Sequence, residues 1–144
     1  MKAVKLSALA GTILAAMLSV APQSAEAGYY SSYSYYPSRG YYYSYYYYKP
    51  YPTYPSYHYH YAIYYPHQPR YVYYYNPYRK VYWGRYDLEG KGYCLLSEEH
   101  RKATLKDIPE SAFPPPGEMP AVPESTDGSK IEVPPAPPKQ APQQ

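Results

Sequence analysis

The chain has 144 residues, a formal net charge of +3 and a mean hydropathy of −0.71, and 27 of its residues are tyrosine. In the 117 residues after residue 27, Ile, Leu, Val, Met and Phe together supply only 13, about 11%, against the roughly 20% expected of a globular core. We therefore exclude one large globular domain, because so little aliphatic surface does not offset the entropy of ordering the chain.

Residues 1–27 have the pattern of a secretory signal peptide. Lys2 and Lys5 precede an uncharged, mostly apolar run of 15 residues, and Ala25-Glu26-Ala27 supplies a small-x-small pattern before a cut. An uncleaved anchor is the alternative, but the run is shorter than the roughly 18 to 20 residues of a spanning helix. We expect cleavage after Ala27 and a mature chain that is secreted to the periplasm, cell envelope or extracellular space, with no stable membrane span.

Residues 28–80 form a low-complexity arm rich in tyrosine and proline. Tyrosine supplies 26 of the 59 residues from 28 to 86. Strand-like pieces at 40–48, 57–65 and 71–75 lie between prolines, which are too frequent for a helix or a central strand. We predict a largely disordered arm with transient β and polyproline II character, able to self-associate through residues 41–48.

Residues 81–113 are the only stretch of ordinary sequence complexity. Two apolar pieces, 81–87 and 92–96, flank a turn-rich linker, which predicts a β-hairpin. Ser97 fits the N-cap of a short helix from residue 98 to residue 105. The pattern predicts a small α+β module. The side chains expected to contact a partner are Tyr82, Trp83, Tyr86 and Leu95.

The last segment, residues 114–144, has ten prolines in 31 residues and is typical of an extended, disordered spacer or an exposed ligand. Charge also divides the chain. Residues 28–85 carry six basic and no acidic residues, whereas residues 86–144 carry six basic and ten acidic residues, a net of −4. The two halves could attract one another, or they could be two solvated segments of different origin.

The tyrosines carry the main functional hypothesis. Phenol rings stack in offset or edge-to-face pairs, and interspersed arginines and lysines add cation–π contacts. Neighbouring phenols can also be coupled oxidatively where an oxidase or a peroxide is present. Many weak, interchangeable contacts suit cohesion, adhesion or assembly; an inert spacer is the simpler alternative.

Histidine and cysteine give two weaker signals. His58 and His60, with His67 nearby, are candidate ligands for Cu, Zn or Ni, although such a set lacks a carboxylate or a thiolate. Cys94 is the only cysteine, so it could form an intermolecular disulfide or be a half-buried apolar residue. No enzyme activity, cofactor or nucleic acid partner is expected.

Two stretches resemble known sequences. The run from Tyr82-Trp83-Gly84-Arg85-Tyr86-Asp87 to Ile108-Pro109-Glu110-Ser111-Ala112-Phe113 is similar to a motif of uncharacterised exported bacterial proteins and spans about a quarter of the chain. It implies export and no known activity. Tyr45-Tyr46-Tyr47-Tyr48-Lys49-Pro50 resembles fragments of plant wall extensins, but the serine-polyproline blocks of extensins are absent.

The sequence therefore predicts a secreted structural protein of the envelope or extracellular matrix, assembling through its tyrosines. Two alternatives remain open. One is a non-enzymatic binding protein that uses residues 81–113, with the tyrosine-rich arm as a tether. The other is weak metal binding by His58 and His60.

Overall fold

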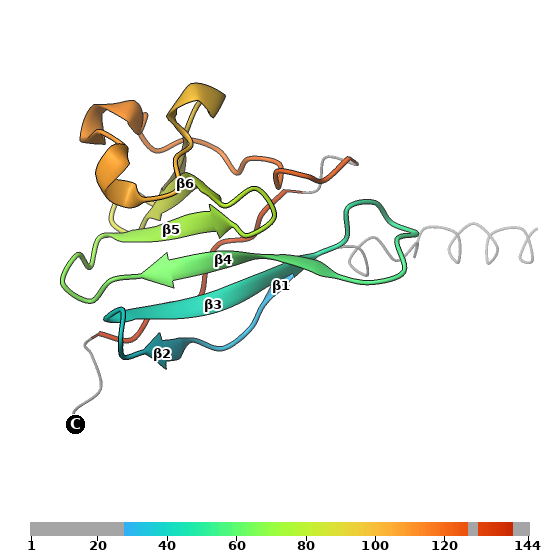
Figure 1. The fold of residues 1–144 in the computed structure, drawn as a ribbon, viewed down its shortest axis with the longest axis horizontal. Helices are drawn as coiled ribbons and strands as arrows, with labels where there is room; N and C mark the ends of the chain where they lie inside the picture. The colour runs from blue at the N-terminus through green and yellow to red at the C-terminus, as the bar shows by residue number, and fades with distance from the viewer. Residues whose placement is uncertain (1–27, 127–129, 140–144) are drawn as a thin grey trace, which may run out of the picture.

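The computed structural model describes residues 28–126 and 130–139, so the predicted signal peptide lies outside the described residues. The described chain forms one antiparallel sheet, in which the strands follow one another across the sheet as they do in the sequence (Figure 1). The exception is at one edge, where β1 and β2 both pair with β3. The strands are β1 (Tyr29–Tyr30), β2 (Ser34–Tyr36), β3 (Tyr41–Tyr48), β4 (His58–Tyr64), β5 (Tyr71–Asn76), β6 (Val81–Asp87) and β7 (Gly92–Leu95).

The prediction of a mostly disordered chain is wrong, because the tyrosine-rich arm builds β1 to β5. In β3 the residues alternate between buried and half-buried along all eight positions, which is the two-residue period of a strand with two different faces. Tyrosine favours this environment, because its ring packs against cross-strand neighbours on a pleated surface. Half of the buried hydrophobic residues in the described chain are tyrosines. Tyrosine thus fills the role that the aliphatic count assigned to Leu, Ile and Val.

The prolines do not interrupt the strands, because they lie in the connections between them. Pro37 is in the turn before β3, and Pro77 is in the turn before β6. The longer connections on either side of β4 hold the rest of the arm's prolines, which are Pro50, Pro52, Pro55, Pro66 and Pro69. Proline is tolerated there because no ladder hydrogen bond is lost. The same residues that argued against a sheet therefore mark where its strands end.

Residues 81–95 confirm the predicted hairpin, whose strands β6 and β7 pair from Asp87↔Gly92 to Gly84↔Leu95. The hairpin is not a separate module, because β6 also pairs with β5 of the arm. A bulge between Tyr74 and Tyr75 leaves Trp83 as an extra residue on β6. The sheet therefore runs without a break across the predicted boundary at residue 80.

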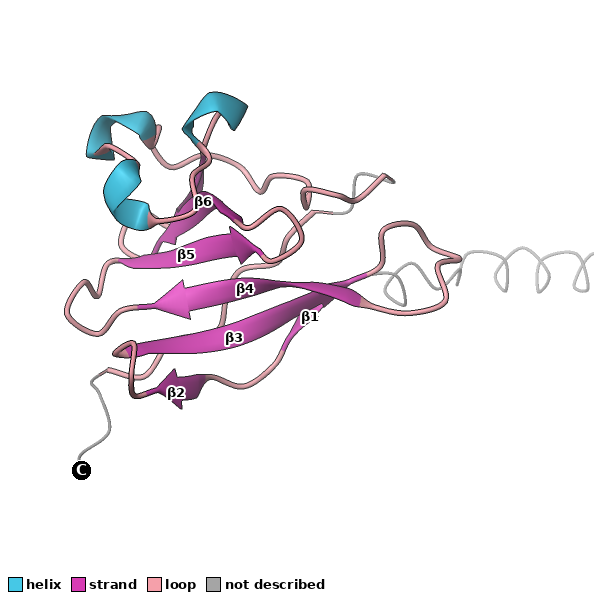
Figure 2. Ribbon diagram, in the orientation of Figure 1, coloured by secondary structure: helices cyan, strands magenta, loops and turns pink. Residues whose placement is uncertain are grey.

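The predicted helix at 98–105 is wrong. Three short 3₁₀ turns follow β7 instead: η2 (Glu98–His100), η3 (Leu105–Asp107) and η4 (Glu110–Ala112) (Figure 2). The Ser97 hydroxyl does not cap a backbone amide and lies 2.9 Å from His100 Nδ1. Arg101 is already extended, and the carbonyl of Lys102 accepts a hydrogen bond from the amide of Tyr82. A helix this short is marginal alone, so this pairing with the sheet prevails.

The two faces of the sheet are covered by different segments. On the inner face, which buries Tyr46 and Tyr74, Val122 and Ile131 of the C-terminal segment complete the core. On the outer face, Leu96 and Ile108 pack on Ile63, Tyr73 and Tyr82. Figure 1 shows residues 130–139 passing behind the sheet, while Gly117, in the segment that follows η4, pairs with Tyr93 at the β7 edge. The predicted disordered tail therefore contributes to the core over its described residues.

Register in the arm depends on a small pair at the centre of the sheet. Ser44 lies opposite Ala62, and both are fully buried. The Ser44 hydroxyl donates a hydrogen bond of 2.7 Å to the carbonyl of Ser31, and Ser31 Oγ accepts one from the amide of Tyr45. These hydrogen bonds join the segment between β1 and β2 to β3. In the described part of the chain, no helix is long and apolar enough to cross a membrane.

Candidate functional site

The part of the outer face over β2, β3 and β4 is a layer of tyrosine rings. We call this surface the tyrosine face, and its rings are Tyr36, Tyr41, Tyr43, Tyr45, Tyr47, Tyr59 and Tyr61. Strand alternation places them there, since the odd-numbered residues of β3 and of the paired part of β4 share one side. A shallow hollow of about 150 Å³ opens among five of these rings and Ile63. The surface is therefore aromatic and only partly covered.

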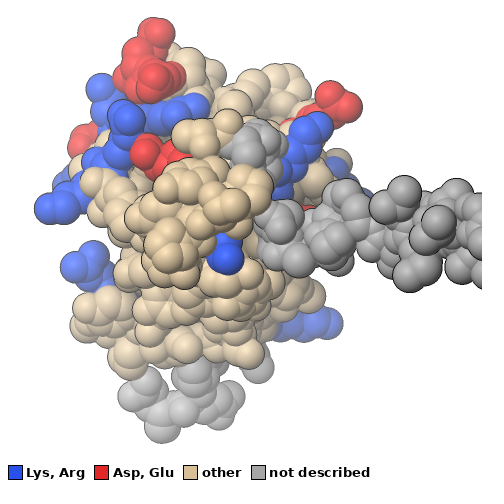
Figure 3. Space-filling view, turned by 90° about the vertical axis from the view of Figure 1, so that its right-hand side faces the viewer, with Lys and Arg blue, Asp and Glu red and all other residues tan. Residues whose placement is uncertain are grey.

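Ring contacts hold this surface in a fixed arrangement. Tyr45 lies with its ring centroid 4.8 Å from that of Tyr59 in an edge-to-face pair, and 5.2 Å from that of Tyr61. Burial raises the pKa of Tyr61, so its hydroxyl stays protonated at physiological pH. Two basic side chains lie over tyrosine rings of the arm, Arg39 over Tyr36 and Lys49 over Tyr57. Figure 3 shows the lower part of one side as mostly uncharged, with isolated basic groups.

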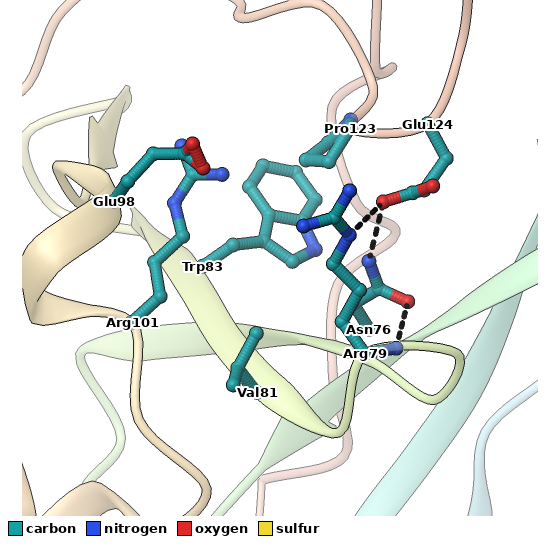
Figure 4. Close-up of a pocket in the computed structure, with 8 residues that line it drawn as sticks. All are labelled: Asn76, Arg79, Val81, Trp83, Glu98, Arg101, Pro123 and Glu124. Carbon is teal, nitrogen blue, oxygen red and sulfur yellow. Dashed lines mark hydrogen bonds and ion pairs between the residues drawn. The ribbon is translucent and has the colours of Figure 1, made fainter.

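A second hollow, the charged cavity, lies beside the β5–β6 turn and has a volume of about 600 Å³ (Figure 4). Its lining residues are Asn76, Arg79, Val81, Trp83, Glu98, Arg101, Pro123 and Glu124. Arg79 Nε donates to Glu124 at 2.7 Å, which ties the turn to the C-terminal segment. Arg101 Nε donates to the carbonyl of Leu96. Two arginines and two glutamates nearly balance one another, so the cavity has no single-sign field.

Behind the charged cavity lies a buried hydrogen-bonded chain centred on His60. Trp83 Nε1 donates to His60 Nδ1 at 3.0 Å, so Nδ1 carries no proton. The other nitrogen, Nε2, then carries the proton and lies 3.2 Å from the hydroxyl oxygen of Tyr48. Burial, with a smaller contribution from nearby His58, lowers the pKa of His60 to about 3. His60 is therefore neutral and serves the core.

The structure does not assemble the predicted metal ligands. His58 and His60 lie on the same side of β4 as expected, but both ring nitrogens of His60 already have partners. His67 lies in the connection beyond the far end of β4, where its ring contacts Tyr65. In the described ranges 28–126 and 130–139, no three His, Cys, Asp or Glu residues form a group that could hold a metal.

Three of the four predicted partner-contact residues face the interior. Tyr82, Trp83 and Tyr86 are buried, and Trp83 is only 1% exposed. Leu95 is exposed, at the sheet edge formed by β7. The sequence predicts a binding surface in residues 81–113, the stretch of ordinary complexity. In the structure the aromatic residues of this stretch build the core. The rings that face solvent lie in the low-complexity arm.

Cys94 is buried, and burial raises the pKa of its thiol. We expect the native thiol to react about a hundredfold more slowly with Ellman's reagent than the thiol of the urea-unfolded chain, because the thiolate is scarce and inaccessible. Equal rates in the two states would contradict the buried position. Slow native reaction would also argue against an intermolecular disulfide through Cys94 in the folded chain.

Sequence reasoning did not single out Arg85, which is buried between two rings. Its guanidinium carbon lies 3.6 Å from the centroid of Tyr71 and 3.9 Å from that of Phe113. Nη2 donates to the carboxylate of Glu110, and this pairing lowers the pKa of Glu110. The arginine thereby clamps η4 onto the outer face. The hint in the sequence was one basic residue within an otherwise apolar strand pattern.

Searches against protein-family models, curated proteins and solved structures found no match to this chain.

Proposed function

We propose that this chain is an exported structural protein of the cell envelope or extracellular matrix, and that it assembles through the tyrosine face. The observation that supports the proposal is a partly exposed layer of seven mutually packed rings on one face of the sheet. Such a surface presents large apolar area with many hydroxyls and loses little side-chain entropy on contact, because neighbouring rings already fix each ring.

Charge also favours association of this surface with like copies. The strands that form it come from the segment without acidic residues, and the opposite end of the chain carries the acidic excess. A face with few charges costs little to desolvate, whereas buried unpaired charges would oppose contact. Weak, repeated aromatic contacts then give cohesion without a shaped pocket.

The alternative of a binding module with a tether has less support. The arm is part of the same sheet as residues 81–95, so it does not serve as a separate flexible tether. Three of the side chains assigned to recognition are in the core. Metal binding by His58 and His60 has no supporting observation beyond their shared side of β4.

The test is self-association of the mature chain after removal of two rings from the tyrosine face. We expect Tyr43→Thr/Tyr45→Thr to weaken assembly roughly tenfold to a hundredfold, because each of these half-buried rings contributes about 0.5 to 1.5 kcal/mol to contact with another ring. Threonine keeps the preference for a strand. Sedimentation velocity over a range of concentrations measures the dissociation constant.

The matched control is Tyr51→Thr/Tyr54→Thr, which removes two rings from the connection between β3 and β4. This control should assemble like the wild type. Equal loss in both variants would indicate a general effect of tyrosine content, and no loss in either would refute assembly through the tyrosine face.

Covalent cross-linking is a further step of the same proposal. Two phenols each lose one hydrogen atom, a carbon–carbon bond forms between their rings, and a peroxide is reduced to water by a peroxidase. Dityrosine in hydrolysed envelope fractions, compared with a strain lacking the protein, measures this step. A yield no higher than in the deletion strain would limit the assembly to non-covalent contacts.

A further inference from the structure

Residues 130–139 contact the inner face of the sheet with a period of three. Ile131 and Pro134 are buried, Pro137 and the adjacent Pro138 are half-buried, and Glu132, Val133, Pro135 and Ala136 are exposed. A polyproline II helix has three residues per turn, so one side chain in three falls on the same side. The segment also has the composition for it, with Pro134-Pro135-Ala136-Pro137-Pro138. Its burial pattern is therefore that of a proline-rich ligand lying along a surface.

Tyrosine hydroxyls of the sheet recognise the main chain of this segment. Tyr33 donates to the carbonyl of Pro135 at 3.1 Å, and Tyr30 donates to the carbonyl of Glu132. Tyr46 lies 3.4 Å from the carbonyl of Lys130. Burial raises the pKa of all three phenols, to about 12 for Tyr46, so they remain donors. We call Tyr30, Tyr33 and Tyr46 the tail-binding surface.

These contacts match a general mode of peptide recognition. Proline-rich segments dock on aromatic surfaces because the extended helix is already formed and its carbonyls are free to accept hydrogen bonds. The hydroxyls of the tail-binding surface donate hydrogen bonds to three carbonyls within six residues. The buried side chains of Ile131 and Pro134 supply the apolar contact. The contacts thus belong to one short segment.

We propose that the tail-binding surface is a binding site for extended proline-rich segments, filled within one chain by its own residues 130–139 and between chains by the same segment of a second copy. Exchange between copies reproduces every contact, so it adds no new interface to be stabilised. The use in trans rests on the proposed assembly, because packed copies raise the local concentration of tails. The binding site itself does not depend on that function.

The experiment measures binding of a fluorescein-labelled peptide of residues 130–139 to the dilute, full mature chain by anisotropy. In the wild type the chain's own tail competes for the site, so peptide binding should be weak. Pro134→Glu places a charge at the buried position of the resident tail and should strengthen peptide binding by about tenfold or more. Glu132→Gln changes an exposed side chain of the same segment and should behave like the wild type.

Two further binding measurements make the outcome decisive. A peptide carrying Pro134→Glu should lose binding to the Pro134→Glu protein, and Tyr33→Phe in that protein should weaken binding of the unmodified peptide. If Pro134→Glu does not fold by circular dichroism, Pro134→Ala replaces it, because it shortens the buried ring without adding charge. A folded variant that binds the peptide no better than the wild type would overturn the proposal. Assembly defects of Tyr43→Thr/Tyr45→Thr with normal peptide binding would separate the two sites.

Discussion

Replacing Trp83 with alanine should lower the free energy of unfolding by about 3 to 5 kcal/mol, the range for deleting a buried aromatic side chain. Trp83 is 1% exposed and stacks on Tyr74 with ring centroids 5.1 Å apart. Its indole N–H also supplies the hydrogen bond to His60. The substitution thus removes packing from the inner face and one partner from the buried chain, so both losses add.

Chemical denaturation followed by circular dichroism measures this loss, and two variants separate its causes. Trp83→Phe keeps most of the ring but leaves His60 Nδ1 without a donor, which should cost about 1 to 3 kcal/mol. Leu95→Ala, two positions after a buried tyrosine but 40% exposed, should change stability by less than about 1 kcal/mol. A Trp83→Ala effect as small as that of Leu95→Ala would show that the indole is not in the core.

Acid should destabilise the protein well above the range in which its carboxyl groups titrate. The pKa of His60 is about 3 in the folded chain, against about 6.5 for an unfolded histidine. Between these values the unfolded chain binds a proton that the folded chain does not, so stability is full above pH 6.5 and falls as the pH falls. The expected slope is about 1.4 kcal/mol for each pH unit.

The window from pH 6.5 to about pH 5.5 isolates this effect, because it lies above the unfolded pKa values of the carboxyl groups. The Arg70 guanidinium holds the pKa of Asp87 low, and Arg85 does the same for Glu110, so these carboxylates contribute only at lower pH. Denaturation at several pH values should show the slope in the wild type and in His67→Gln, whose side chain is exposed. His60→Gln should be less stable at pH 7 and lose most of the slope. An unchanged slope in His60→Gln would assign it to another group.

The positions of the strands could be predicted from the sequence, whereas their stability could not. The pieces 40–48, 57–65 and 71–75 agree closely with β3, β4 and β5. A count of aliphatic residues alone predicts that these strands are transient. Tyrosine can take the place of aliphatic residues in a core when its hydroxyl reaches water or a hydrogen-bond partner. Tyr30, for example, reaches Tyr74 and a main-chain carbonyl. Composition rules built on average proteins miss such a core.

Other features depend on contacts far apart in the sequence, which local patterns do not reveal. Nothing near His60 indicates that Trp83 will donate to it, since the bulge in β6 helps place the indole on the inner face. The carbonyls of Lys130, Glu132 and Pro135 meet hydroxyls of Tyr46, Tyr30 and Tyr33 across 84 to 102 positions. The tyrosine face was the most predictable part of the site, because its rings follow from alternation in β3 once that strand is known to be stable.

Ser44 has a consequence for how the chain reaches its fold. All residues of β3 except Ser44 are tyrosine. Sliding β3 by two positions against β4 would therefore return nearly the same pairs on each face. The slip would place a phenol ring opposite the buried Ala62 and would displace Tyr48 from its hydrogen bond with His60. Folding must therefore choose among mispaired states of similar energy, and this favours slow searching and kinetic traps. The small side chain of Ser44, within a run of tyrosines, thus helps to specify the register between β3 and β4.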